Sequence, residues 1–365
     1  MTAVRPLIWP ARIVRPLIPR LVYLDLNHWI GLAKHAKGQP TRDGYDHLRM
    51  AIDGAKAAGT AVFPLSGTHY LEMSRIPNPA QRMDVATVMA EVSGFRVLLG
   101  RVTIGQLEID AGLDEIIAVP TTGHSVPLMG TSVGWAFGQV GGLRISKSDG
   151  EDVTDTMDPE FLKRLNFKFE FEVLAGPSDE DEAVLRSNYG YEPERAWALS
   201  EERVKQEREQ AKRLDTDPRW RRGRLSDVIG AREIGGEWLD QVNAACAARG
   251  GTIGELLGEG ERIRGFADGM PSNRVAMGVK YRYHKNPKHR WTSNDIADID
   301  ALAVAVPYCD AVYSDNAARS ALLAHHLDAT FGIFLPRTPA QLAEWLEALP
   351  ARARDDGDED PSAGP

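Results

Sequence analysis

Residues 21–33 read LVYLDLNHWIGLA. The apolar run over 21–24 predicts a buried strand, and the helical spacing of the apolar residues that follow predicts a helix. Asp25 lies where the strand ends and the helix begins. In doubly wound folds the carboxyl ends of parallel strands form the edge at which ligands bind. The stretch therefore predicts an α/β domain in which Asp25 points toward a crevice.

Two further stretches repeat this arrangement of a strand, an acidic residue and a helix. DAVYSD (310–315) predicts a short strand over 311–313, and Asp315 follows its carboxyl end just before a helix over 316–323. AVFPLSGTHYLEM (61–73) predicts a strand, a Ser66 N-cap and a helix that carries Glu72. A parallel sheet would bring these acidic residues to the same edge as Asp25.

A fourth acidic position lies on a late helix, predicted over 291–307 in the stretch WTSNDIADIDALAVAVP. At 100° per residue, Asp295 and Asp298 are only about 60° apart on that helix. Asp300 lies on roughly the opposite side from Asp298. We therefore include Asp295 and Asp298 in the predicted site and leave Asp300 out.

The order of these acidic residues resembles that of the PIN-domain nucleases. The resemblance rests on YLDLNHWI, SGTHYLE, NDIADIDALAVAVPYCDAVYSD and TPAQLAEWLEAL, within about 21–100 and 290–349. It implies a three-layer α/β/α domain with a central, mostly parallel sheet, and a ribonuclease that depends on a divalent metal. Single-stranded or structured RNA is the implied substrate. Toxin-type ribonucleases are among the relatives, so an antitoxin partner or a homo-oligomer is a further expectation.

The metal should be Mg²⁺ or Mn²⁺, because these hard cations prefer carboxylate and water oxygens. We expect Asp25, Glu72 and Asp298 to bind it directly, and Asp315 and Asp295 to bind directly or through water. Two departures from the family pattern matter: Leu26 replaces a small or hydroxyl residue, and two aspartates share the late-helix register. Which of Asp295 and Asp298 is the direct ligand therefore stays open. Asn27 and Ser314 are the expected supporting residues, and Asn27 should orient Asp25.

The four parts expected of the chain are an irregular arm over 1–20, the discontinuous nuclease domain over 21–100 and 290–349, a mainly helical insertion over 101–289, and a disordered acidic tail over 350–365. A chain of 365 residues exceeds one typical domain. No stretch is long and apolar enough for a membrane span or a secretory signal. The two distant cysteines favour the reducing cytoplasm over a disulfide framework.

The net charge of −9 by itself opposes binding of nucleic acid, but the distribution of charge matters more than the sum. The stretch KYRYHKNPKHRW (280–291) interleaves cations with aromatic residues and ends four residues before Asp295. Cations and aromatic faces together hold a phosphodiester backbone and stack unpaired bases. The alternative is an ordinary solvated loop. The predicted substrate contacts are Lys285, Lys288, Arg290, Arg75 and His69.

Two other functions stay open. A phosphatase of the haloacid-dehalogenase type also places Asp after its first strand, although it favours a second acid where this chain has Asn27. A catalytically idle RNA-binding or toxin-neutralising scaffold could also keep the fold. The motifs of P-loop ATPases, dinucleotide-binding enzymes, serine hydrolases and zincins are absent from the sequence.

Overall fold

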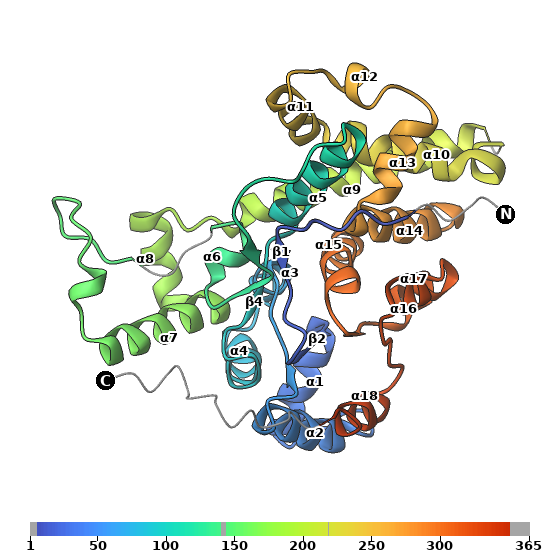
Figure 1. Ribbon diagram of the computed structural model, residues 1–365. Helices are drawn as coiled ribbons and strands as arrows, with labels where there is room; N and C mark the ends of the chain where they lie inside the picture. Colours follow the sequence, from blue (N-terminus) through green and yellow to red (C-terminus); the bar gives the residue numbers. More distant parts are fainter. Residues whose placement is uncertain (1–5, 140–143, 218, 351–365) are drawn as a thin grey trace.

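The computed structural model describes residues 6–139, 144–217 and 219–350, and shows an α/β protein that is mostly helical (Figure 1). Its largest sheet contains β3 (Ala61–Val62), β2 (Arg20–Leu24) and β7 (Ala311–Tyr313) in that order, all parallel. β2 is the central strand and aligns Leu24 with Tyr313. The predicted strands over 21–24 and 311–313 are thus confirmed as direct neighbours.

Short pairings extend this sheet on both sides. Leu65, beyond β3, forms a parallel bridge to Val97, and Ala311 of β7 forms one to Phe334. β4 (Val97–Leu98) also pairs antiparallel with β6 (Met129–Gly130). Each strand is short, so helices provide most of the surface that buries the sheet.

The helices that carry the predicted acidic residues begin near the carboxyl edge of this sheet. They are α1 (Leu26–Ala36), α3 (Gly67–Met73), α15 (Ser293–Tyr308) and α16 (Asn316–Ala324). Ser66 is the N-cap of α3, as predicted. α15 extends past the expected end at Pro307, which lies in its last turn.

Other helices complete the body around the sheet. They are α2 (Tyr45–Ala57), α4 (Pro79–Ser93), α17 (Leu327–Phe331) and α18 (Pro339–Glu347). α2 packs along α18 although the two are far apart in sequence, and α1 packs on α4 (Figure 1).

The described part of 101–289 is mainly helical, as expected. Its helices are α5 (Arg101–Ile116), α6 (Val133–Ala136), α7 (Pro159–Ala175), α8 (Asp179–Tyr189), α9 (Pro193–Thr216), α10 (Leu225–Arg232), α11 (Leu239–Ala248), α12 (Ile253–Leu256), α13 (Glu261–Gly269) and α14 (Pro271–Lys285), with a π-helical turn η3 (Glu233–Glu237). Leu174, Val204 and Val279 of this region are buried in the same hydrophobic core as the sheet. The insertion therefore packs as part of the main body, with a smaller second core around Trp238.

The described part of the amino-terminal arm is attached to the body. β1 (Ile13–Val14) pairs parallel with β5 (Val126–Pro127), and the Trp9 ring meets Tyr308 edge to face. The expectation of an irregular arm over 1–20 is therefore wrong for this strand. The predicted acidic tail lies outside the described residues, except for Pro350. Nowhere in the described ranges is there a helix with the length and apolar character that crossing a membrane requires.

Candidate metal centre

Three of the five predicted acidic residues meet in space. Asp25, Glu72 and Asp298 each offer one carboxylate oxygen, and these oxygens all lie within 4.8 Å of one another. They come from the end of β2, from α3 and from α15, which are distant in sequence. We call these three residues the open acidic cluster, because none of them forms an ion pair with any residue that the structure describes.

Asp25 is held at the junction between β2 and α1. Its backbone N–H donates to the Tyr313 carbonyl at 2.9 Å, which continues the pairing of β2 with β7. Asp25 is the N-cap residue of α1, yet its side chain makes no capping hydrogen bond. Asn27 Nδ2 donates to Asp25 Oδ2 at 3.3 Å, as expected for an orienting residue. The carboxylate is therefore oriented by its neighbour Asn27 and does not cap α1.

Burial and the repulsion of nearby carboxylates raise the pKa of every member of the cluster. Burial is the main cause at all three. It raises the pKa of Asp25 to about 6, with a contribution from the charge of Asp315. Burial and the charge of Asp25 raise the pKa of Glu72 to about 8. The pKa of Asp298 is also about 8, because burial acts together with the charges of Asp25, Asp315 and Glu72. A divalent cation would relieve this repulsion.

Asp315 lies beside the open acidic cluster, and its side chain also caps a helix. As the N-cap of α16 it accepts a hydrogen bond from the Ala318 N–H at 2.7 Å. Its charge still raises the pKa of both Asp25 and Asp298. Asp315 is thus near enough to act on the cluster electrostatically while one of its oxygens caps a helix.

Asp295 is engaged in capping α15. Its Oδ2 accepts from the Thr292 N–H at 2.7 Å and from the Thr292 hydroxyl at 2.9 Å. His289 Nε2 lies 3.4 Å from its other oxygen. Of the two aspartates left open by the sequence, the structure brings Asp298 into the cluster and assigns Asp295 to the helix cap. Asp300 points elsewhere and pairs with Arg203.

Two neutral histidines hold the backbone just before Asp25 and Asp315. Of the two, only His69 was predicted from the sequence to belong to the site. His69 is fully buried; its Nε2–H donates to the Leu24 carbonyl at 2.8 Å and its Nδ1 accepts from the Ser66 N–H at 3.0 Å. His28 Nε2 lies 3.3 Å from the Ser314 carbonyl, with Nδ1 2.9 Å from the Tyr45 hydroxyl. Burial lowers the pKa of both rings to about 4.

Each histidine thus donates to the carbonyl immediately before an acidic residue, namely Asp25 or Asp315. This placement gives His69 a positioning role and leaves it no exposed surface, so the predicted substrate contact by His69 is not supported. Ser314 takes part through its backbone carbonyl. His28 could have been found from its place three residues after Asp25, on the first turn of the helix, but a lone histidine is a weak signal.

The basic stretch divides into exposed cations and buried aromatic residues. Lys285, Lys288 and Arg290 are exposed, as a role in substrate binding requires. Tyr283 and Trp291 are buried against His289 and cannot stack bases in this structure. Of the aromatic residues expected to stack bases, Tyr281 is therefore the main one that stays accessible, and it is half-buried. Arg75, the other predicted cation, is half-buried, and its charge acts to lower the pKa of Glu72.

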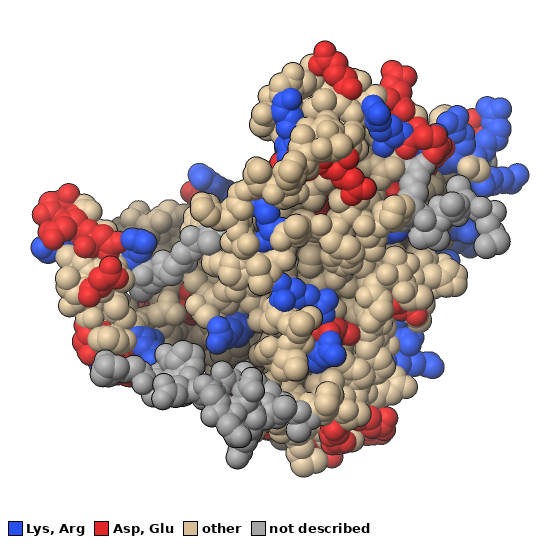
Figure 2. All heavy atoms as spheres, in the orientation of Figure 1, with Lys and Arg blue, Asp and Glu red and all other residues tan. Residues whose placement is uncertain are grey.

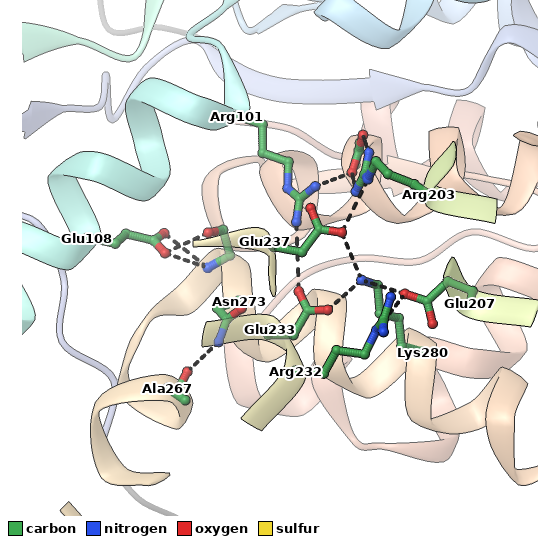
Figure 3. Close-up of polar contacts among 12 residues, drawn as sticks. Arg101, Glu108, Arg203, Glu207, Arg232, Glu233, Glu237, Ala267, Asn273 and Lys280 are labelled. Carbon is green, nitrogen blue, oxygen red and sulfur yellow. Dashed lines mark hydrogen bonds and ion pairs between the residues drawn. The ribbon is translucent and has the colours of Figure 1, made fainter. Parts of the chain in front are cut away.

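A second acidic group contains Glu207, Glu233 and Glu237, whose carboxylate oxygens also lie within 4.8 Å of one another. Here the Lys280 Nζ sits among the three (Figure 3), 3.2 Å from Glu207 and 3.4 Å from Glu237 and hydrogen-bonded to Glu233. Lys280 is 1% exposed, so this member of the basic stretch cannot contact substrate. We call this group the closed acidic cluster, because a protein cation already fills it.

Surface charge is unevenly distributed. The first turn of α8 carries four acidic residues. In Figure 2 acidic side chains also gather at the left, over the loop that precedes α7, and Lys and Arg gather at the opposite end of the same view, beside acidic residues. The net charge of −9 therefore does not describe every part of this face.

Comparison with known proteins identifies no relative: no family model, curated protein or solved structure matches this chain.

Proposed function

We propose that this protein is a divalent-metal-dependent ribonuclease whose metal is held by Asp25, Glu72 and Asp298. The observation that carries the proposal is the open acidic cluster, in which three carboxylates converge from separate elements without an ion-pair partner among the described residues. Folding concentrates negative charge there at a cost that a bound cation would offset.

The donor set fits Mg²⁺ or Mn²⁺. All three side chains offer carboxylate oxygens, and the described residues place no histidine or cysteine ligand in the group. Such a metal would lower the pKa of a bound water and neutralise charge that develops on a phosphate. Asn27 would orient Asp25, and His69 would hold the strand end that presents it. Asp315 would add a further carboxylate beside the metal.

RNA is the proposed substrate because hydrolysis of a phosphodiester is the reaction that hard metals on carboxylates promote, and because exposed cations follow α14. Lys285, Lys288 and Arg290 are exposed and would hold the backbone. The fold is proposed to be PIN-like. The parallel order β3-β2-β7, with bridges to Val97 and Phe334 on either side, supports this.

The deciding experiment is incubation of a pooled RNA with the full chain in Mn²⁺, Mg²⁺ or EDTA, followed by sequencing of the ends. We expect cleavage with either metal and none in EDTA. Asp25→Asn and Glu72→Gln should abolish it, while both proteins stay folded. RNA binding without cleavage by the unaltered chain would favour the idle scaffold. Capture of an aspartyl-phosphate at Asp25 would favour the phosphatase.

A further inference from the structure

A cavity of about 620 Å³ lies between α10, α14 and the turn that joins α16 to α17. This volume is in the range of ligand pockets in proteins. Its apolar lining includes Ile229, Met277 and Leu327, and its polar lining includes Tyr281 and Lys285. In one wall of the cavity Gly278 packs closely against Leu327. A Cβ atom at position 278 would lie 3.0 Å from Leu327 Cδ1.

The polar lining has the character of a phosphate site. Lys285, Arg274, His325 and His326 all line the cavity, with Asp268 as the acidic member. The pKa of His325 is lowered by burial and, in addition, by the positive charges of Lys285 and Arg282. Lys285, His325 and His326 thus lie near one another in the lining, where cations and ring N–H groups can bind a phosphate.

The same cavity also offers aromatic surface for a base. The rings of Tyr281 and His325 meet edge to face, with centroids 4.9 Å apart, and both are half-buried. Lys285 Nζ lies 5.7 Å from the centre of the Tyr281 ring, on an exposed side chain. Aromatic surface and cations together are what proteins use to hold an unpaired nucleotide.

The cavity and the open acidic cluster share the end of α14. Tyr281 and Lys285 line the cavity. Tyr283, between them in sequence, faces the other way, because the charges of Asp298 and Asp315 act on its hydroxyl. Exposed Lys288 follows Lys285 in the segment that leads to α15. A strand held in the cavity could therefore continue around the end of α14 toward the cluster.

We propose that this cavity binds one nucleotide of an RNA strand, with Lys285, His325 and His326 on its phosphate and Tyr281 against its base. The nucleotide would flank the bond that is cut. The identity of the polymer as RNA and its cleavage rest on the proposed function. The binding of a nucleotide in the cavity does not.

The test uses the full-length Asp25→Asn protein and three probes: inorganic phosphate, adenosine 5′-monophosphate and a single-stranded RNA octamer. Affinities are measured by calorimetry, and binding is located from the amide NMR signals of Gly278 and His326. We expect the nucleotide and the octamer to shift both signals. Phosphate alone should bind more weakly at the same place.

Three substitutions make the test specific. Lys285→Ala should weaken nucleotide binding by about tenfold or more, since hydrogen bonds to charged groups are the stronger ones. The matched control is Lys212→Ala, which removes one exposed positive charge from α9, away from the cavity lining, and should change little. Tyr281→Leu should weaken nucleotide binding by about tenfold through lost stacking, with phosphate binding unchanged, whereas Tyr281→Phe should preserve both.

The proposal is overturned if the nucleotide leaves the Gly278 and His326 signals unmoved, or if Lys212→Ala weakens binding as much as Lys285→Ala. Failure of the proposed function gives a different result. In that case the nucleotide still binds in the cavity while the unaltered protein cuts no RNA with Mn²⁺. If RNA is cut but Lys285→Ala and Tyr281→Leu leave KM unchanged, the cavity site is wrong and the nuclease stands.

Discussion

The two acidic clusters have the same composition in outline and differ in whether a protein cation compensates them. Each brings three carboxylates within 4.8 Å of one another. In the closed cluster, burial acts to raise the pKa of Glu207, but the hydrogen bond from His284 and the charge of Lys280 outweigh it and leave that pKa below its ordinary value. The pKa of Glu237 is also lowered, by Lys280 and Arg203, whereas burial leaves that of Glu233 raised. In the open cluster all three pKa values are raised.

The closed cluster belongs to a larger buried network that is balanced in charge. Its cations are Arg101, Arg203, Arg232 and Lys280, and its anions are Asp300, Glu207, Glu233 and Glu237 (Figure 3). It joins α5, α9, α10, η3, α14 and α15. Proximity of carboxylates therefore does not identify a metal site; the absence of a compensating protein cation is the more telling feature.

The largest expected effect separates two aspartates on the same helix. Loss of a residue that supports a metal ligand costs roughly 10–100-fold in metal affinity. Asp298→Asn removes a ligand itself, so it should reduce cleavage and metal affinity by more than that. Asp300→Asn should keep metal affinity but lose about 3 kcal/mol of unfolding free energy, because Arg101 and Arg203 lose the carboxylate that they share and keep only Glu233 and Glu237. Isothermal calorimetry with Mn²⁺ and urea unfolding measure the two quantities. Equal loss of metal affinity in both variants would show that the assignment of Asp298 is wrong.

Removing the internal cation should break the closed cluster. Lys280→Met leaves Glu207, Glu233 and Glu237 without their shared partner and should destabilise the fold by about 3–5 kcal/mol in urea unfolding. Adding Glu233→Gln to that variant should recover part of the loss, because it removes one uncompensated charge. If Lys280→Met unfolds at the same urea concentration as the unaltered chain, Lys280 does not neutralise this cluster.

We expect His69 and His28 to support metal binding by the open acidic cluster without contacting the metal themselves. His69→Ala frees the Leu24 carbonyl before Asp25, and His28→Ala frees the Ser314 carbonyl before Asp315. We expect a loss of about 10–100-fold in Mn²⁺ affinity for each. Calorimetry gives the affinity, and circular dichroism at the same temperature serves as the folding control. Full affinity in a folded His69→Ala protein would contradict the positioning role.

The smallest expected effect is the dependence of stability on pH. The folded-state pKa values of Asp25, Glu72 and Asp298 lie above their ordinary values, so the folded protein binds protons more tightly than the unfolded chain. The metal-free protein should therefore lose stability as pH rises from about 4 to about 8.

Metal should reverse this trend. At pH 8 a hundredfold excess of Mn²⁺ over its Kd should add about 2.7 kcal/mol of unfolding free energy. At pH 5 the gain should be smaller, because protons compete for the same oxygens. Thermal unfolding with Mn²⁺ or EDTA across this range checks both statements. Asp298→Asn should flatten the metal-free profile, and a profile that falls equally steeply without Asp298 would place its cause elsewhere.

Several elements near the site could be predicted from local sequence because they depend on local chemistry. The apolar run before Asp25 forms β2, Ser66 caps α3 and Asp315 caps α16. The wheel positions of Asp298 and Asp300 also hold, since helix geometry alone separates them. The highly charged run over 192–215 was harder to interpret, because its buried Glu207 is held by His284 and Lys280 of α14, which no local pattern indicates.

By itself the sequence determined where the acidic residues stand relative to strand ends and helix starts, because hydrophobic periodicity and capping act over only a few residues. Tertiary structure alone decided which carboxylates meet, and which of them already have a cation. Lys280 reads as one more member of a basic stretch, yet it lies buried among three glutamates from α9 and η3. Asp298 differs from Asp295 only by one turn of helix, but Thr292 engages Asp295 and leaves Asp298 to the cluster. Such pairings depend on long-range packing, which sequence spacing does not encode.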